Sequence, residues 1–179
     1  MNKMKKEFKK LLDINIIKKN TDNINKLKVT LKKNKIKGAG LYASKPIKKG
    51  SVIAYYKMKV FEYNKYKSPT GEVYTFDVYK KNGNTDKKLI ADLYEGSIDK
   101  PFRGKPLWAF FSNEPDAGKP ENAHIYEDNK KNFRNRDKLY PGDIVVYKLV
   151  AVKNINSGEE VVWCYGDSYV RNYSVPSCE

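Results

Sequence analysis

Short apolar segments alternate with turn residues along most of this chain, and that alternation constrains what it can fold into. The segments with strand character are 27–31, 40–43, 52–56, 73–79, 89–91, 123–126 and 144–152, separated by turns such as Lys49-Gly50 and Pro141-Gly142-Asp143. Short strands joined by turns pack as small sheets, and no strand–helix–strand alternation indicates a parallel nucleotide-binding sheet. The pattern therefore predicts a mainly β fold.

The first 34 residues have a different character. Four apolar residues at helical spacing, Phe8, Leu11, Leu12 and Ile16, predict a short N-terminal helix, which an Asn-rich link at 20–25 separates from a leading strand. Residues 1–37 contain 13 lysines and three acidic residues, so they hold ten of the fifteen net positive charges. This basic extension is a candidate surface for nucleic acid, chromatin or an acidic partner. The competing explanation is a Lys, Asn and Ile bias such as an AT-rich coding sequence produces.

Length and composition indicate which class of protein the chain belongs to. A chain of 179 residues with 40% hydrophobic and 32% charged residues matches one globular domain. No apolar stretch approaches the roughly 20 residues that cross a bilayer, and no secretory signal is evident, so we expect no membrane and an intracellular protein of the nucleus or cytoplasm. Two cysteines, Cys164 and Cys178, are too few for a disulfide framework or a cysteine-rich zinc site and fit a reducing compartment.

Three segments have features of a binding or catalytic site. In the segment 37–43 two glycines flank one residue and allow the backbone to approach a ligand closely. In the segment 108–122 the apolar run Trp-Ala-Phe-Phe leads into a polar loop rich in Pro, Asp and Gly, of a kind that often carries function. The segment 151–167 ends an apolar strand with Trp163, Cys164, Tyr165 and Gly166. Its tyrosine is expected where the chain turns.

In this order and at these separations, the three segments resemble the SET-domain family of protein lysine methyltransferases, over roughly residues 35–168. The chain has no cysteine cluster before the domain and no three-cysteine tail after it, so it is similar to minimal, viral-type members without zinc-binding flanks. The resemblance implies a SET fold of several small sheets with a knot-like C-terminal crossing, which Asn122 is expected to tie. It also implies three parts, namely a basic extension at 1–34, the SET domain at 35–168 and a tail at 169–179.

The same resemblance implies a function. A SET domain of this type is expected to transfer a methyl group from S-adenosylmethionine to a lysine side chain of a protein, and histone tails are the family's commonest substrates. Two alternatives stay open: a non-catalytic SET module that only binds, and a basic protein that binds nucleic acid or chromatin. The compact size is compatible with a monomer or a homodimer.

Site residues follow by matching the family's motifs. Tyr165 matches the catalytic tyrosine, and Tyr56 and Trp163 match walls of the lysine channel. Glu114 stands where most members have histidine in the motif NHSCxPN, so this chain departs from the family's pattern beside the adenine contacts. No metal is expected. The residues expected to bind the cofactor are Gly38, Ala39, Gly40, Tyr74, Asn113, Glu114 and Tyr165, with Tyr169 or Tyr173 of the tail as a cover.

Overall fold

The computed structural model describes residues 12–21, 24–34, 37–65, 74–78, 89–94, 98, 100–128, 139–166 and 169. Its elements in chain order are α2 (Ile14–Asn20), η1 (Ile24–Lys26), β1 (Val29–Asn34), β2 (Gly38–Ala43), β3 (Val52–Glu62), η2 (Tyr63–Lys65), β4 (Phe76–Val78), β5 (Leu89–Leu93), η4 (Ala109–Phe111), β6 (Ala123–Glu127) and β7 (Ile144–Ala151). The mainly β class is confirmed. A short N-terminal helix is present as α2, but it begins at Ile14 and runs to Asn20, and the predicted core residue Ile16 is exposed while Ile14 and Ile17 are buried. Residues 1–11 lie outside the described residues.

Helix α2 is short, and its ends explain its limits. The Asp13 side chain accepts the backbone N–H of Asn15 at 2.8 Å and caps the N-terminus, and Lys18 and Lys19 lie in the last turn, where cations interact favourably with the helix dipole. Ile14 and Ile17 are its buried residues. Seven residues are too few for a stable isolated helix, so this burial holds α2 in place.

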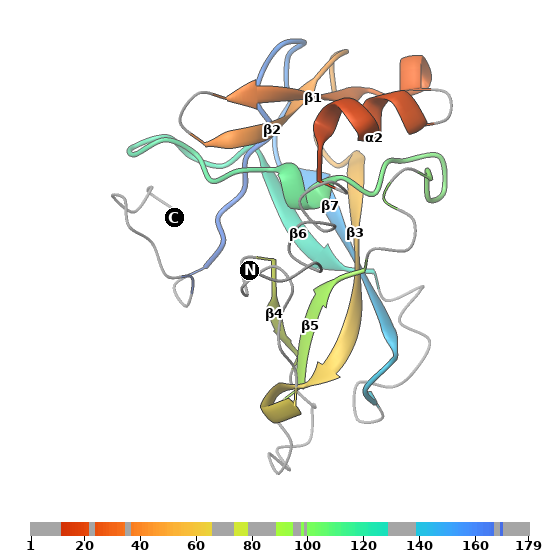
Figure 1. The fold of residues 1–179 in the computed structure, drawn as a ribbon. Helices are drawn as coiled ribbons and strands as arrows, with labels where there is room; N and C mark the ends of the chain where they lie inside the picture. Colours follow the sequence, from red (N-terminus) through yellow and green to blue (C-terminus); the bar gives the residue numbers. More distant parts are fainter. Residues whose placement is uncertain are drawn as a thin grey trace.

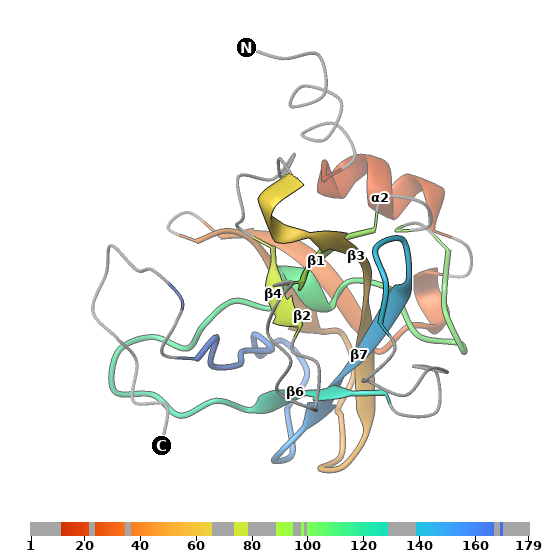
Figure 2. The same ribbon diagram turned by 90° about the horizontal axis from the view of Figure 1, so that it is seen from below.

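A two-stranded and a five-stranded sheet form the body of the protein. Strands β1 and β2 make an antiparallel hairpin, and the larger antiparallel sheet has the order β4-β5-β3-β7-β6. Figure 1 shows the hairpin and α2 as an upper layer across one end of the larger sheet, and Figure 2 shows the same arrangement from below. The short helix η4 lies between the two sheets and contacts β2 and β3.

The core fills the space between these layers. Residues from the hairpin, the large sheet and η4 form one cluster, in which Leu31, Leu41, Met58, Trp108 and Leu149 are 0% exposed. Alternation along β3 places Ala54, Tyr56, Met58 and Val60 on the core side. The helix η4 forms the end of the apolar run 107–111, and its residues pack against one strand of each sheet, β2 and β3.

The end of the SET-like segment crosses between the hairpin and the loop that follows η4. On one side, Val161 N–H bonds to the Leu41 carbonyl at 2.8 Å and Ala43 N–H bonds to the Glu159 carbonyl at 2.9 Å. On the other side, Trp163 N–H bonds to the Asn113 carbonyl at 3.0 Å, and Asn122 N–H bonds to the Val162 carbonyl at 3.2 Å. Both ends of the loop 113–122 therefore bond to the segment 162–163 that passes between them, which is the knot-like crossing that the family resemblance implies.

Several details differ from the sequence-based expectations. Strand β3 extends to Glu62 because it pairs with β7 as far as Lys59 and with β5 from Met58 to Glu62, whereas the described strand β4 covers only Phe76–Val78 of the expected 73–79. Cys164 is disulfide-bonded, which the expectation of a reducing compartment did not anticipate, and Cys178 lies outside the described residues. Within the described part of the chain, no helix is long and apolar enough to cross a membrane.

Candidate active site

Tyr165 is held at both its ends by the segment that follows η4. Its hydroxyl donates a hydrogen bond to the Ser112 carbonyl at 3.0 Å, and its backbone N–H donates to Glu114 Oε1 at 2.9 Å. Ser112 and Glu114 are 1% and 3% exposed, so both acceptors are fixed in a packed segment. Gly166, with φ of 89°, turns the chain directly afterwards, a conformation that glycine adopts without strain. The ring of Tyr165 is thus fixed in one orientation.

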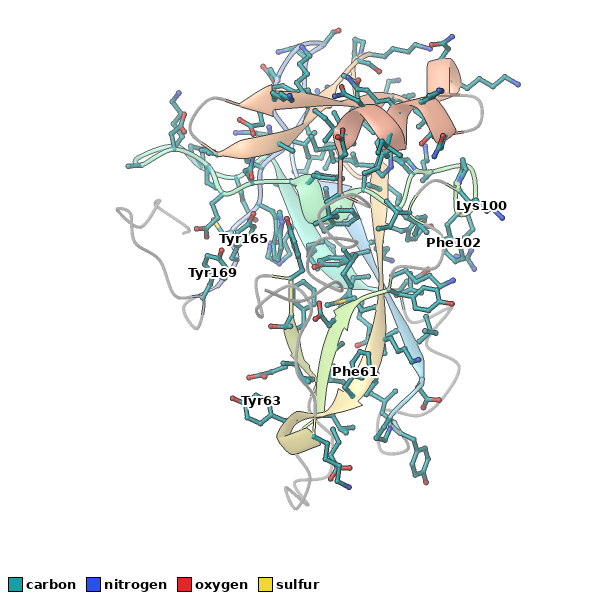
Figure 3. The ribbon with its side chains drawn as sticks, viewed as in Figure 1. Phe61, Tyr63, Lys100, Phe102, Tyr165 and Tyr169 are labelled. Atoms are coloured by element: carbon teal, nitrogen blue, oxygen red, sulfur yellow. The ribbon has the colours of Figure 1, made fainter. Side chains whose placement is uncertain are left out.

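An aromatic cluster surrounds this tyrosine. The Tyr165 ring centroid lies 5.0 Å from that of Trp163 and 4.8 Å from that of Tyr169, and Figure 3 shows Tyr165 and Tyr169 beside each other. The cluster continues from Trp163 to Phe76 at 6.0 Å and from Phe76 to Tyr56 at 5.1 Å. Contacts of this kind stabilise a fixed packing, and the rings present electron-rich faces that attract cations.

Tyr56 and Tyr74 are coupled within the cluster. The Tyr56 hydroxyl, on a residue only 2% exposed, donates to the Tyr74 carbonyl at 2.8 Å. Burial raises the pKa of Tyr56 well above its ordinary value, and the negative charge of Asp92 adds to this shift. Burial likewise raises the pKa of Tyr74. Both phenols therefore stay neutral at physiological pH.

Three polar groups adjoin the aromatic cluster, and we name them the polar triangle: the Ala39 carbonyl of β2, the Asn113 side chain and the Glu160 side chain. Asn113 Nδ2 donates to Glu160 Oε1 at 2.8 Å and to the Ala39 carbonyl at 3.2 Å. A Cβ atom added at Gly40 would lie 2.6 Å from Glu160 Oε1 and 3.1 Å from Asn113 Nδ2. Only glycine fits there, so the backbone of β2 runs directly against the two polar side chains.

Lys37 anchors the loop from the hairpin side. Its ammonium group donates to the Glu114 carbonyl at 2.7 Å and pairs with Asp116 Oδ1 at 2.8 Å. Hydrogen bonding and charge from Lys37 lower the pKa of Asp116 below its ordinary value. One lysine thereby joins the start of β2 to the segment that positions Tyr165.

The indole nitrogen of Trp163 is the one buried side-chain polar atom of the described residues without a hydrogen-bond partner. The residue is 9% exposed and lies between Phe76 and Tyr165 in the aromatic cluster. A buried N–H without an acceptor is costly, by about 1–3 kcal/mol, unless a ligand or water completes it. This donor therefore marks the aromatic cluster as a place where a bound molecule would gain a hydrogen bond.

The structure brings most of the predicted site residues together. Tyr56, Tyr74, Trp163, Tyr165 and Tyr169 belong to the aromatic cluster. The remaining described residues lie in or beside the polar triangle, and these are Gly38, Ala39, Gly40, Asn113 and Glu114. Tyr173 lies outside the described residues.

Sequence reasoning missed other members of the site. Phe76 and Phe110 link Tyr56, Tyr74 and Trp163 by ring contacts, and the Ser112 carbonyl accepts the Tyr165 hydroxyl. Phe76 lies two residues after Tyr74, which is the spacing that places two side chains on one face of a strand. Ser112 offers a backbone carbonyl, which no side-chain motif can reveal. In the described part of the chain, no group of three or more His, Cys, Asp or Glu residues could hold a metal ion.

The chain is similar in sequence to one known protein family. The SET domain family model matches residues 38–166. No curated protein sequence matches the chain significantly. Among solved structures, the chain is similar to a Plasmodium falciparum protein described as a candidate histone methyltransferase, at 19% identity and a TM-score of 0.49, over 80% of this chain and 96% of that one. Because the family model covers more than half of the sequence, from β2 through Tyr165 to Gly166, the chain belongs to the SET-domain family.

Proposed function

We propose that this protein is a protein-lysine N-methyltransferase that uses S-adenosylmethionine. Membership of the SET family supports a methyltransferase-type function. The observation that carries the finer proposal is the setting of Tyr165, whose hydroxyl and backbone are both fixed by the segment 112–114 within a cluster of aromatic rings. We propose Tyr165 as the catalytic tyrosine, and Tyr56 and Trp163 as walls of the lysine channel.

The hydrogen bonds of the two phenols suit them to receive an amine. The Tyr165 hydroxyl donates a hydrogen bond to the Ser112 carbonyl, and the Tyr56 hydroxyl donates one to the Tyr74 carbonyl. A hydroxyl group that donates its one hydrogen can interact with an incoming N–H group only as an acceptor. Two fixed acceptors among aromatic faces would orient a lysine amine and exclude water from it.

The same surroundings favour the reactive form of the lysine. An ammonium group has no lone pair, and its ordinary pKa of about 10.4 keeps it charged at neutral pH. Burial among Tyr56, Trp163 and Tyr165 disfavours the charged form and lowers that pKa. When bound, S-adenosylmethionine would supply a methyl carbon on a positively charged sulfur, so that a neutral amine could form the new N–C bond while the C–S bond breaks and the neutral thioether leaves.

The residues of the polar triangle fit such a cofactor. Asn113 uses both protons of Nδ2 within the protein, and no donor among the described residues reaches its Oδ1 atom, which is an acceptor suited to an amino group. Gly40 lets the backbone lie where a side chain would collide. We propose Gly38, Ala39, Gly40, Asn113 and Glu114 as cofactor-binding residues, with Asn113 at the amino acid end, Tyr74 beside the cofactor and Tyr169 or Tyr173 as the cover over its adenine.

Radiolabelled methyl transfer to a panel of histones and to cell extract tests the proposal. Tyr165→Phe should lower transfer by about 10²-fold or more, because a misplaced amine reacts poorly, while S-adenosylmethionine binding measured by calorimetry stays intact. Tyr140→Phe is the matched control, since Tyr140 is 55% exposed and lies outside the cluster. Equal transfer by wild type and Tyr165→Phe would overturn the role of Tyr165.

The alternative function is a non-catalytic SET module, for which the change to Glu114 in the loop is the specific reason. The same assay separates the two functions. Cofactor binding without transfer to any histone or extract protein would support the non-catalytic module. Transfer to an extract protein but to no histone would retain the methyltransferase and replace the proposed histone substrate.

A further inference from the structure

A positively charged surface covers the upper layer of the molecule, away from the aromatic cluster. Residues 12–49 contain ten described lysines and one described acidic residue, Asp13. Eight of the lysines are exposed, namely Lys19, Lys26, Lys28, Lys32, Lys33, Lys45, Lys48 and Lys49. Outside residues 1–37 the whole sequence holds 23 basic and 18 acidic residues, so a uniform lysine bias does not explain this concentration.

The hairpin fixes part of this surface in space. Val29 and Leu31 are 2% and 0% exposed and face the core, so the alternating residues Lys28 and Lys32 face outward. Their positions four residues apart on an extended chain are separated by about 13 Å. The Lys32 ammonium lies 5.1 Å from the centre of the Tyr42 ring, which braces it without neutralising its charge.

Neighbouring turns extend the same surface. Lys45 Nζ bonds to the Asn25 carbonyl at 3.2 Å, which brings the turn after β2 beside η1 and Lys26. The Lys49 backbone N–H bonds to Asn154 Oδ1 at 2.9 Å, so the turn 48–50 lies next to Lys153, another exposed lysine. We name the exposed lysines at 19, 26, 28, 32, 33, 45, 48 and 49, together with Lys153, the lysine layer.

We propose that the lysine layer binds the phosphate backbone of a nucleic-acid duplex. A duplex carries one negative charge per roughly 1.7 Å of its axis, so the 13 Å between Lys28 and Lys32 spans about eight phosphate charges. Lysine ammonium groups on flexible stems act as point charges toward phosphates and need no base-specific geometry. The surface therefore fits binding that depends on charge and not on base sequence.

The chemistry favours this partner over a lipid surface. An interfacial helix inserts an apolar face into the membrane, but α2 uses Ile14 and Ile17 for the protein core. Ile16, at 36% exposure, is the one large hydrophobic residue of this layer among the exposed ones that the structure describes. The layer is mixed at one edge, where the exposed Glu159 interacts with Lys153. Exposed lysines without apolar anchors are otherwise typical of phosphate-backbone binding.

This inference is independent of the proposed methyltransferase function and has its own test. Fluorescence anisotropy of the full chain with 20-base-pair DNA and RNA duplexes should show binding. The logarithm of the association constant should fall with the logarithm of the salt concentration at a slope of about −4 or steeper. The triple change Lys28→Gln, Lys32→Gln and Lys48→Gln should reduce that slope by about 3 and the affinity at 0.1 M salt by roughly 10²–10³-fold.

A matched triple variant controls for total charge. Lys65, Lys100 and Lys119 are exposed and lie outside the lysine layer. Changing them to Gln should therefore alter the slope of the salt dependence by no more than about 1 from the wild-type value. Circular dichroism melting checks that both triple variants fold. Equal weakening by the two triples, no duplex binding at 50 mM salt, or tighter binding to phosphatidylserine vesicles or to a poly-glutamate peptide would each overturn the inference.

Discussion

Glu114 Oε1 accepts the backbone N–H of Tyr165 at 2.9 Å, from a side chain that is 3% exposed. The loop thereby touches the chain at the residue we propose for catalysis. In the family this loop position is usually histidine, so the bond uses the residue by which this chain departs from the common motif. Because the Glu114 side chain is buried, loss of this acceptor would leave the Tyr165 N–H without its hydrogen bond and without access to water.

Glu114→Ala should therefore destabilise the protein and misplace Tyr165. A buried donor left without its acceptor costs about 1–3 kcal/mol, and urea unfolding measures this change. Glu114→Gln keeps an acceptor oxygen and should recover most of the stability and of the methyl transfer. If Gln behaves like Ala, the role of this bond in positioning Tyr165 is wrong.

Gly40→Ala should weaken cofactor binding. The added methyl would lie 2.6 Å from Glu160 Oε1 and 2.9 Å from Tyr42 Cε2, so the polar triangle must shift. We expect a loss of about 1–3 kcal/mol in stability, as for other overpacked sites, together with at least a tenfold loss of S-adenosylmethionine affinity in calorimetry.

Gly50→Ala is the control for that change. Gly50 has φ of 82°, but nothing lies within 4 Å of an added Cβ. It should lose about 1–2 kcal/mol from backbone strain and bind the cofactor as wild type does. Equal cofactor affinity in the two variants would show that the close approach at Gly40 has no part in binding.

Tyr56→Phe should affect stability in a pH-dependent way. At pH 8 the variant loses the hydrogen bond to the Tyr74 carbonyl, worth about 1 kcal/mol. Because the folded pKa of Tyr56 is raised, its phenol contributes fully below the unfolded value of about 10 and progressively less as pH rises toward the folded pKa. The difference in unfolding free energy between wild type and Tyr56→Phe should therefore shrink between pH 8 and pH 10.5. A constant difference would contradict the raised pKa.

Asn122→Ala should loosen the crossing of the chain. Asn122 is 6% exposed, its Nδ2 donates to the Glu160 carbonyl and its Oδ1 accepts the Val162 N–H, each at 2.8 Å. Removing both bonds should lower the unfolding free energy by about 2–4 kcal/mol. Asn154→Ala removes a bond from an exposed asparagine to Lys49 N–H and should cost under about 1 kcal/mol. Similar losses in the two variants would remove Asn122 from the role of tying the crossing.

Much of the fold could be predicted from local pattern. Alternation of apolar and polar residues, with turn residues between the segments, indicates each described strand, because side chains of a strand point to opposite faces in turn. Local pattern does not predict where a strand ends when pairing decides it: β3 runs on to Glu62 because β5 pairs with it over Met58–Glu62. The crossing at Asn122 was expected from family resemblance alone, because bonds between residues 38 or 40 positions apart leave no local periodicity.

For the candidate site, the sequence by itself determined which residue types stand at the motif positions, including Gly40, Asn113 and Tyr165. Only the tertiary structure decided what they touch. The Ser112 carbonyl that receives the Tyr165 hydroxyl is a backbone group, and Phe76 joins Tyr56 to Trp163 across more than 80 residues of chain. Such contacts arise when the crossing strand packs against the loop, and their distances depend on the whole core, so no short segment encodes them.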